Sequence, residues 1–151
     1  MGLIKNDRQL AITRDRLEGT LQVLAKLKAK YRSGPMWRAV SAGPLGFKEQ
    51  LKGEIREYLW LKKATPEQVM RRHKAVIMSE IGPFLARLRI ASRLTQADLA
   101  KRVGCSQPDI ARIEDADYQG HSTETLRSVA EALGVEIVLG AHKTKEPKRV
   151  G

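Results

Sequence analysis

Apolar residues recur at helical spacing in the first part of the chain. The pattern predicts a first helix over residues 13–30, with Thr13 as a candidate N-cap. Its apolar face consists of four residues spaced three, four or one apart: Leu17, Leu21, Leu24 and Ala25. We therefore expect one side of this helix to pack against a neighbour.

The segment that follows should interrupt the helix. Residues 33–46, SGPMWRAVSAGPLG, contain three glycines and two prolines. A second helical run comes next, with Leu51, Ile55, Tyr58 and Leu59 on one face and Glu54, Arg56 and Lys62 on the other. Neither stripe lasts for the three or four heptads of a long coiled coil. We interpret residues 1–64 as an N-terminal helical hairpin, which could also dimerise.

A helix start follows the hairpin directly. In ATPEQ, Thr65 is a candidate N-cap, Pro66 suits the first helical position and Gln68 can close a capping box. The helix can run to about Met78, before Gly82-Pro83 interrupts it. Because it carries the sequence RRHK at 71–74, residues 65–78 are predicted to form a basic connecting helix.

Residues 94–114, LTQADLAKRVGCSQPDIARIE, predict two short helices joined by a tight turn. Thr95 can cap the first helix, Gly104 suits a left-handed turn, and Ser106 can cap the second helix. Ile110 and Ile113 are the expected buried positions of that second helix. A helix, a tight turn and a helix whose start faces outward form the geometry that enters a DNA major groove.

This stretch resembles the helix-turn-helix of the Xre/Cro family of phage-type repressors. The resemblance rests on five residues that match the spacing of the family motif: Gln96, Ala100, Gly104, Ile110 and Ile113. Residues 81–93 look like the first helix of that family, with Ile81, Leu85 and Leu88 inward, and residues 122–135 look like its fourth. The resemblance implies a mainly α fold, in which a lambda-repressor-like domain over 79–142 follows the hairpin.

The resemblance also implies roles for individual residues. Gln96 looks like a phosphate contact, Ser106 like a cap and phosphate donor, and Gln107 like a bidentate reader of an adenine edge. Ala111 and Arg112 lie one turn further along the recognition helix, predicted over 106–116. In the loop that follows, Tyr118 and Gln119 could contact the DNA backbone.

Two more features of the motif bear on the interface. Arg89 and Glu114 occupy positions that in this family often form a structural ion pair between the first and third helices. Pro108 and Asp109 replace the commoner polar residues, and Asp109 near a phosphate would be repelled. The identity of the bases that are read therefore stays open.

The end of the domain departs from the five-helix pattern of the family. In VEIVLGAH, Val135, Ile137 and Leu139 alternate with other residues, which predicts a short β-strand after Gly134. A lone strand would leave its backbone groups unpaired, so we expect the same strand of a second subunit to pair with it in a homodimer. The antitoxin branch of the family has such a C-terminal strand. Residues 143–151 should form a flexible basic tail.

Charge favours a polyanionic partner, with double-stranded DNA first. The chain has a formal net charge of +11 and a pI near 10.1. Residues 1–78 hold 17 Lys and Arg against 7 Asp and Glu, whereas residues 79–151 hold 11 against 10. We therefore predict that the N-terminal module lies along the DNA flanks, with Arg71 and Arg72 as contacts. The alternatives are that these charges only solubilise exposed helices or that the module binds another protein.

The sequence offers no chemistry that asks for an enzyme, a cofactor or a metal. His73, His121 and His142 lack ligand spacing, and Cys105 in the motif turn is best explained as a packing residue. A single cysteine excludes an internal disulfide. No apolar run approaches the roughly 20 residues of a membrane span, and the N-terminus lacks a signal-peptide pattern. We expect a cytoplasmic protein.

Three functions are compatible with these patterns. The first is a sequence-specific, dimeric transcriptional regulator, most simply a repressor. The second is an antitoxin that sheathes a protein toxin and represses its own operon. Many such toxins are basic, so an N-terminal module (residues 1–78) with a net charge of +10 would be an awkward partner surface. The third is a helical adaptor that does not bind DNA.

Overall fold

The structure, a computed structural model, describes residues 2–115 and 122–141 of the chain. These residues form mainly helices: α1 (Asp7–Tyr31), α2 (Pro35–Leu61), α3 (Pro66–Arg72), the 3₁₀ turn η1 (Met78–Glu80), α4 (Ile81–Ala91), α5 (Gln96–Val103), α6 (Gln107–Asp115) and α7 (Thr123–Ala132). The mainly helical fold expected from the sequence is thus confirmed. Over the described part of the chain, no helix combines the length and the apolar character needed to cross a membrane.

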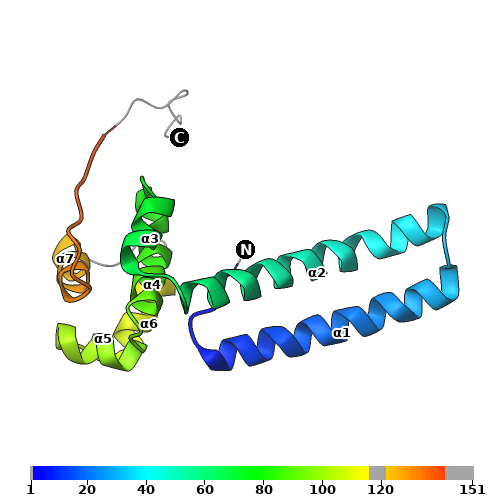
Figure 1. Cartoon of the computed structure of the whole chain (residues 1–151), viewed down its shortest axis with the longest axis horizontal. Coiled ribbons are helices and arrows are strands. Elements are labelled where there is room, and N and C mark those ends of the chain that lie inside the picture. Colours follow the sequence, from blue (N-terminus) through cyan, green and yellow to red (C-terminus); the bar gives the residue numbers. More distant parts are fainter. Residues whose placement is uncertain (1, 116–121, 142–151) are drawn as a thin grey trace, which may run out of the picture.

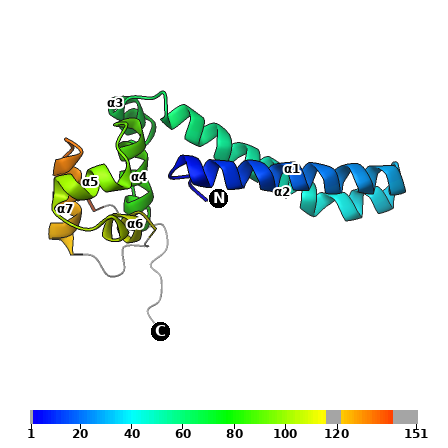
Figure 2. The same cartoon turned by 90° about the horizontal axis from the view of Figure 1, so that it is seen from below.

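The first two helices form a long antiparallel hairpin that projects from a compact body built by the other helices (Figures 1 and 2). Helix α1 begins at Asp7, where Asn6 is the N-cap and accepts a hydrogen bond from the backbone of Gln9 over 2.9 Å. The expectation that Thr13 caps this helix is therefore wrong. Thr13 is buried within α1, and its hydroxyl donates to the carbonyl of Gln9 over 2.8 Å.

The inward positions of α1 repeat with alternating steps of three and four residues. They are all buried or half-buried: Leu10, Thr13, Leu17, Thr20, Leu24, Leu27 and Tyr31. This is the heptad spacing of a coiled coil over three repeats. Leu21 and Ala25, which the apolar pattern placed on the inward face, are exposed.

Helix α2 runs through most of the segment expected to break it. The chain turns only at residues 32–34, where Gly34 has a φ of 100° and Pro35 occupies the first helical position. Pro44 lies inside the helix. An internal proline costs a helix about 3 kcal/mol, so packing against α1 must offset this local preference.

The inward face of α2 also differs from the expected one. Leu51, Tyr58 and Leu61 are buried, but Leu59 is exposed. Glu54, expected on the polar side, is buried, and its Oε1 atom accepts from the backbone nitrogen of Gly2 over 2.9 Å. The carboxylate is tolerated there because the start of the chain folds back onto α2 and supplies a hydrogen bond.

The connecting helix is shorter than its sequence suggested. Helix α3 begins with the expected capping box of Thr65 and Gln68, but it ends at Arg72 and not near Met78. Gly82 and Pro83 do not interrupt a helix, because they lie in the first turn of α4. A proline is tolerated there, since the first backbone N–H groups of a helix have no internal partner.

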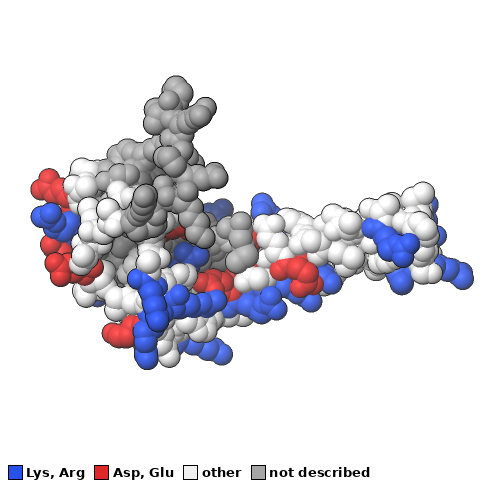
Figure 3. All heavy atoms as spheres, turned by 90° about the horizontal axis from the view of Figure 1, so that it is seen from above, with Lys and Arg blue, Asp and Glu red and all other residues white. Residues whose placement is uncertain are grey.

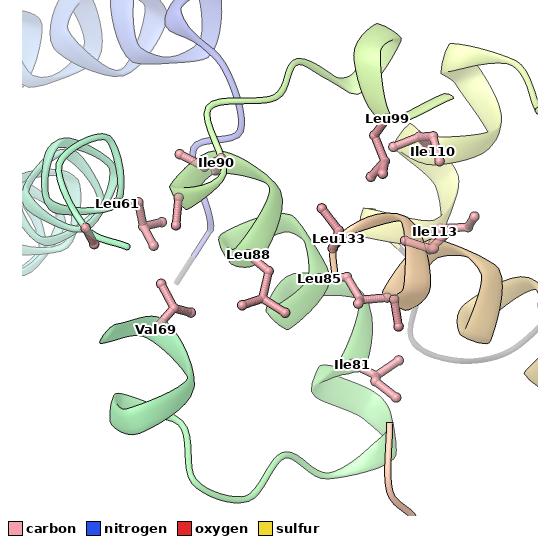
Figure 4. Packing of buried hydrophobic residues seen from close by; sticks show 14 of the residues in the cluster. Leu61, Val69, Ile81, Leu85, Leu88, Ile90, Leu99, Ile110, Ile113 and Leu133 are labelled. Carbon is pink, nitrogen blue, oxygen red and sulfur yellow. The ribbon is translucent and has the colours of Figure 1, made fainter. Parts of the chain in front are cut away.

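One hydrophobic core joins the body to the base of the hairpin (Figure 4). Leu85 and Leu88 of α4 pack at its centre, with Leu99 and Ile110 from α5 and α6. Further core residues come from the hairpin side: Ile4, Leu10, Tyr58 and Leu61. The hairpin base is therefore part of the body, whereas its far end has no contact with it (Figure 1).

The expected C-terminal strand is not shown. Residues 135–141 run on from α7 without regular structure, and no strand occurs in residues 2–115 or 122–141. Val135 and Ile137 still pack against the core, while Val138 and Leu139 are 82% and 68% exposed. A strand forms only where a neighbouring strand accepts and donates backbone hydrogen bonds, and a single chain provides none here. The predicted tail, 143–151, lies outside the described residues.

Candidate nucleic-acid interface

Helices α5 and α6 form a helix-turn-helix whose turn is fixed by capping groups. Thr95 and Asp98 make a capping box at the start of α5, with bonds of 2.9 and 3.0 Å. Gly104 ends α5 in the left-handed region at φ 78°, and its N–H donates to the carbonyl of Ala100. Ala100 is buried, and Cys105 packs partly buried against the core.

The start of α6 carries a second set of caps. Asp109 accepts a 3.0 Å hydrogen bond from the backbone of Ser106 and one from its hydroxyl, and its other oxygen is paired with Arg112. These hydrogen bonds, that from Ser106 first, hold the pKa of Asp109 below its ordinary value. Asp109 therefore remains an anion whose charge is balanced by Arg112 within the helix, which reduces the repulsion of a nearby phosphate.

Two glutamines link the surface of the motif to its interior. The side-chain nitrogen of Gln107 donates to Oε1 of Gln96 over 2.8 Å, and the nitrogen of Gln96 donates to Oε2 of Glu114, also over 2.8 Å. A carboxylate only accepts hydrogen bonds, so it sets the orientation of Gln96 and, through it, that of Gln107. Gln107 is exposed at the first position of α6 and still has one N–H and one carbonyl oxygen to offer.

The carboxylate at the inner end of this chain belongs to a buried ion pair. Glu114 and Arg89 are both about 2% exposed, and Arg89 donates to both carboxylate oxygens. Nη1 of Arg89 donates to the carbonyl of Leu94 over 2.8 Å, and Nη2 also donates to that of Lys5 over 3.2 Å. Each guanidinium nitrogen and each carboxylate oxygen thus makes at least one hydrogen bond, which a buried ion pair requires.

The other residues expected at the interface lie in different places. Ala111 is half-buried on α6. Tyr118 and Gln119 lie outside the described residues. Arg71 and Arg72 are exposed on α3, which packs alongside α4 (Figure 1). Arg72 is paired with Glu57 at 3.2 Å and stacks on the ring of Trp60, so it is partly engaged within the protein.

The structure adds a crevice that the sequence did not indicate. It has a volume of about 440 Å³ and lies between the first turn of α1, the end of α2 and the start of α5. Lys62 of the hairpin and Arg93 of the turn before α5 line it together with Gln96 and Gln107. The residues come from four separate segments, so no local pattern could have grouped them.

Arg93 is held in an unusual conformation at this crevice. Its φ is 61°, and its Nη1 atom donates to the carbonyls of Ala91, Ala64 and Leu61 at 2.8, 3.0 and 3.4 Å. A non-glycine residue in the left-handed region is strained by about 1–2 kcal/mol. The carbonyl of Leu61 lies at the end of α2, and that of Ala64 lies in the loop after it. Arg93 therefore fastens the end of the hairpin to the start of the motif.

The comparisons with known proteins agree with this geometry. A family model described as "Helix-turn-helix domain" matches residues 80–142, which begin just before α4 and exclude the hairpin. The chain is 35% identical over 71 residues to a protein of Mycobacterium tuberculosis (strain ATCC 25618 / H37Rv) named "Putative antitoxin HigA2". That match covers 46% of this chain and 70% of the relative. No solved structure matches the chain at a significant level.

Proposed function

Because this chain belongs to the Xre/Cro-type helix-turn-helix family, we propose that it is a sequence-specific DNA-binding transcriptional regulator. In this proposal α6 enters the major groove with its first turn against the base edges. Binding as a dimer over an operator would make the protein a repressor. The basic net charge of +11 supports DNA as the partner.

The observation that carries the proposal is the orientation of Gln107. Its nitrogen is already directed at Gln96, so one N–H and the carbonyl oxygen remain for a ligand. An adenine presents an acceptor and a donor side by side in the major groove, and a glutamine amide can bind both. Gln96 retains one N–H, which suits a phosphate oxygen next to that base.

The other expected contacts fit around this pair. Ser106 lies beside Gln107 at the start of α6, and Arg112 lies one turn further on, where it can exchange Asp109 for a guanine or a phosphate. Ala111 could contact a thymine methyl group. Tyr118 and Gln119 remain candidates for backbone contacts.

Selection of bound sequences from random duplex DNA tests the proposal. The full-length protein should enrich a pseudo-palindromic site, because each subunit of a dimer reads one half-site. Affinity for that site should exceed affinity for random duplex by about a thousandfold or more. An unenriched pool would support the third function, a helical adaptor without DNA binding.

We propose that dimerisation uses residues 135–141. A groove of about 530 Å³ lies between this segment, η1 and α7, and the neighbouring Val138 and Leu139 are exposed apolar side chains. The same segment of a second subunit could pair with it as a strand. Val138→Asp should then give monomers in light scattering. The matched change Val23→Asp on the hairpin should leave the dimer intact, and the opposite result would move dimerisation to the hairpin.

An antitoxin function is the second candidate, and it is supported by the name of the relative. In that case the protein would bind a small toxin as well as its own operator. Co-expression with a small gene from the same operon tests this directly. A stable complex, and relief of that gene's toxicity, would support the antitoxin function. The basic hairpin predicts that an acidic toxin would bind it better than a basic one.

A further inference from the structure

The crevice at the hairpin base joins a part of the molecule outside the family match to the helix-turn-helix. Both views bring the first turn of α1 close to the start of α5 (Figures 1 and 2). Gln96 and Gln107 of the motif line the crevice together with Lys62 of the hairpin. The crevice is therefore continuous with the surface to which we assign base and phosphate contacts.

Lys62 is positioned at the rim of this crevice by the hairpin itself. Its ammonium group donates to the two carboxylate oxygens of Asp7 at 2.8 and 3.2 Å. Tyr58 donates to Asp7 over 3.1 Å, which holds the carboxylate in turn. About half of the Lys62 side chain is exposed, so its third N–H can reach a ligand in the crevice.

The charges around the crevice favour an anion. Four lining residues are cations, Lys5, Lys62, Arg89 and Arg93, and one is an anion, Asp7. Lys5 is offset by Asp115 and Arg89 by Glu114, both next to the lining. Lys62 is offset by Asp7. The guanidinium of Arg93 bonds only neutral carbonyls through Nη1, and its other nitrogens make no hydrogen bond to the described residues.

The start of α5 adds to this charge. Helix N-termini carry a partial positive charge and have backbone N–H groups without internal partners. The first two residues of α5, Gln96 and Ala97, line the crevice. The crevice thus combines a net positive charge, directional donors and a place next to the base-reading side chain.

We propose that this crevice holds a backbone phosphate of the bound DNA, with Lys62 as the cation contributed by the hairpin. This inference rests on the proposed DNA-binding function. It assigns to the hairpin a local role at the edge of the operator. The hairpin base extends the contact of α5 onto the next phosphate, while the far end of the hairpin does not touch DNA.

Salt dependence of binding tests the role of Lys62. Each phosphate contact contributes a slope of about 0.9 to the fall of log affinity with log salt. Lys62→Gln should therefore flatten the slope by about 0.9, which makes the loss of affinity between 50 and 200 mM salt roughly 3.5-fold smaller. The selected duplex and a random duplex should be affected alike. Thermal unfolding of the variant confirms that it folds.

Two further variants make the test selective. Lys63→Gln removes the same charge one residue away, where the side chain does not line the crevice, and its slope should stay close to that of the wild type. Asp7→Asn removes the anion that competes with the phosphate, so it should raise affinity for both duplexes. Equal effects of Lys62→Gln and Lys63→Gln, or weaker binding by Asp7→Asn, would overturn the crevice site.

The failure of this inference differs from the failure of the proposed function. A wild-type protein that prefers one sequence but is indifferent to Lys62→Gln keeps its function and loses the crevice site. The wild-type protein could instead show no sequence preference while Lys62→Gln still flattens the salt slope for random duplex. That result would overturn the proposed function and support the crevice site. A wild-type protein that binds no DNA overturns both.

Discussion

The hairpin and the helix-turn-helix body differ in the polar side chains that they bury. In the body, the buried polar side chains of α4–α7 are Arg89 and Glu114, which satisfy each other. The hairpin instead buries four polar side chains along its length, Thr13, Thr20, Ser41 and Glu54. Large apolar side chains of the hairpin, such as Val23, Met36 and Phe47, are exposed.

Charge separates the two regions in the same way. On the face shown in Figure 3, acidic and basic side chains intermingle over the body, whereas Lys and Arg gather along one edge and the free end of the hairpin. The body is stabilised by a core that also takes in Leu10, Tyr58 and Leu61 at the hairpin base. The hairpin depends on the pairing of two helices and on its docking at the base, and it contributes most of the positive field.

The largest effect should come from the buried ion pair of the body. Arg89→Ala leaves Glu114 buried without its partner, which should lower the free energy of unfolding by roughly 3–5 kcal/mol. Denaturant unfolding of the variant and the wild type measures this loss of stability. Arg38→Ala on α2, an exposed arginine without an ion pair among the described residues, should change stability by about 0.5 kcal/mol or less. An Arg89→Ala protein that melts like the wild type but loses DNA binding would instead place Arg89 at the phosphate backbone.

Gln107→Ala should have the next largest effect, on binding. Removal of a bidentate base contact should weaken the preferred site by about 1–3 kcal/mol and hardly change binding to random duplex. Gln22→Ala on α1, an exposed glutamine of the hairpin, is the matched control and should change neither affinity. If Gln107→Ala weakens both duplexes equally, then Gln107 does not read bases.

The sequence predicted the helix-turn-helix body better than it predicted the hairpin. In the helix-turn-helix, local signals and tertiary packing agree: Thr95 caps α5, Gly104 adopts a positive φ, and Ile110 and Ile113 are buried. The relay from Gln107 to Glu114 could not be foreseen, because it depends on how α4, α5 and α6 cross.

In the hairpin, local signals pointed the wrong way. The heptad of α1 has threonine at two inward positions, Thr13 and Thr20, so a search for apolar residues selected Leu21 and misplaced the face. Their hydroxyls donate to carbonyls one turn earlier, which lets a polar side chain be buried. Pro44 likewise signals a break that pairing with α1 overrides.

The prediction of a C-terminal strand failed for a different reason. The alternation of Val135, Ile137 and Leu139 predicted a strand that the described residues do not show, although Val135 and Ile137 pack against the core. Strand formation, however, depends on a partner strand, and the sequence of the segment does not show whether a partner strand is present.

Two arginines with positive φ allow a third comparison between the regions. Their substitution should change the free energy of unfolding less than Arg89→Ala does. Arg93, at φ 61°, donates to three carbonyls and joins the hairpin to the body, whereas the side chain of Arg32, at φ 50° in the hairpin turn, makes no hydrogen bond to the described residues. Glycine relieves the strain at both positions.

The signs of the two substitutions should therefore differ. Arg32→Gly should leave stability unchanged or raise it by up to about 1 kcal/mol, since only strain is lost. Arg93→Gly should lower it by about 1 kcal/mol, because hydrogen bonds from a charged donor outweigh the strain. Denaturant unfolding gives both values, and hydrogen exchange should become faster at the hairpin base only in Arg93→Gly. Equal gains in both variants would show that Arg93 does not fasten the hairpin.

The smallest effect is expected from the exposed cations on α3. Arg71 and Arg72 are candidates for contacts along the DNA flanks, but Arg72 is already paired with Glu57, so Arg71 is the cleaner position. Arg71→Glu should flatten the salt slope and weaken all sequences together, leaving their order of preference intact.

The change should be smaller than that of Lys62→Gln, because Arg71 does not line the crevice beside Gln96 and Gln107. Arg38→Glu makes the same charge reversal at the far end of the hairpin, which in our proposal does not touch DNA, and serves as the control. If Arg71→Glu flattens the slope and Arg38→Glu does not, the position of α3 along the DNA matters. Equal changes would mean that only net charge counts and that α3 does not contact DNA.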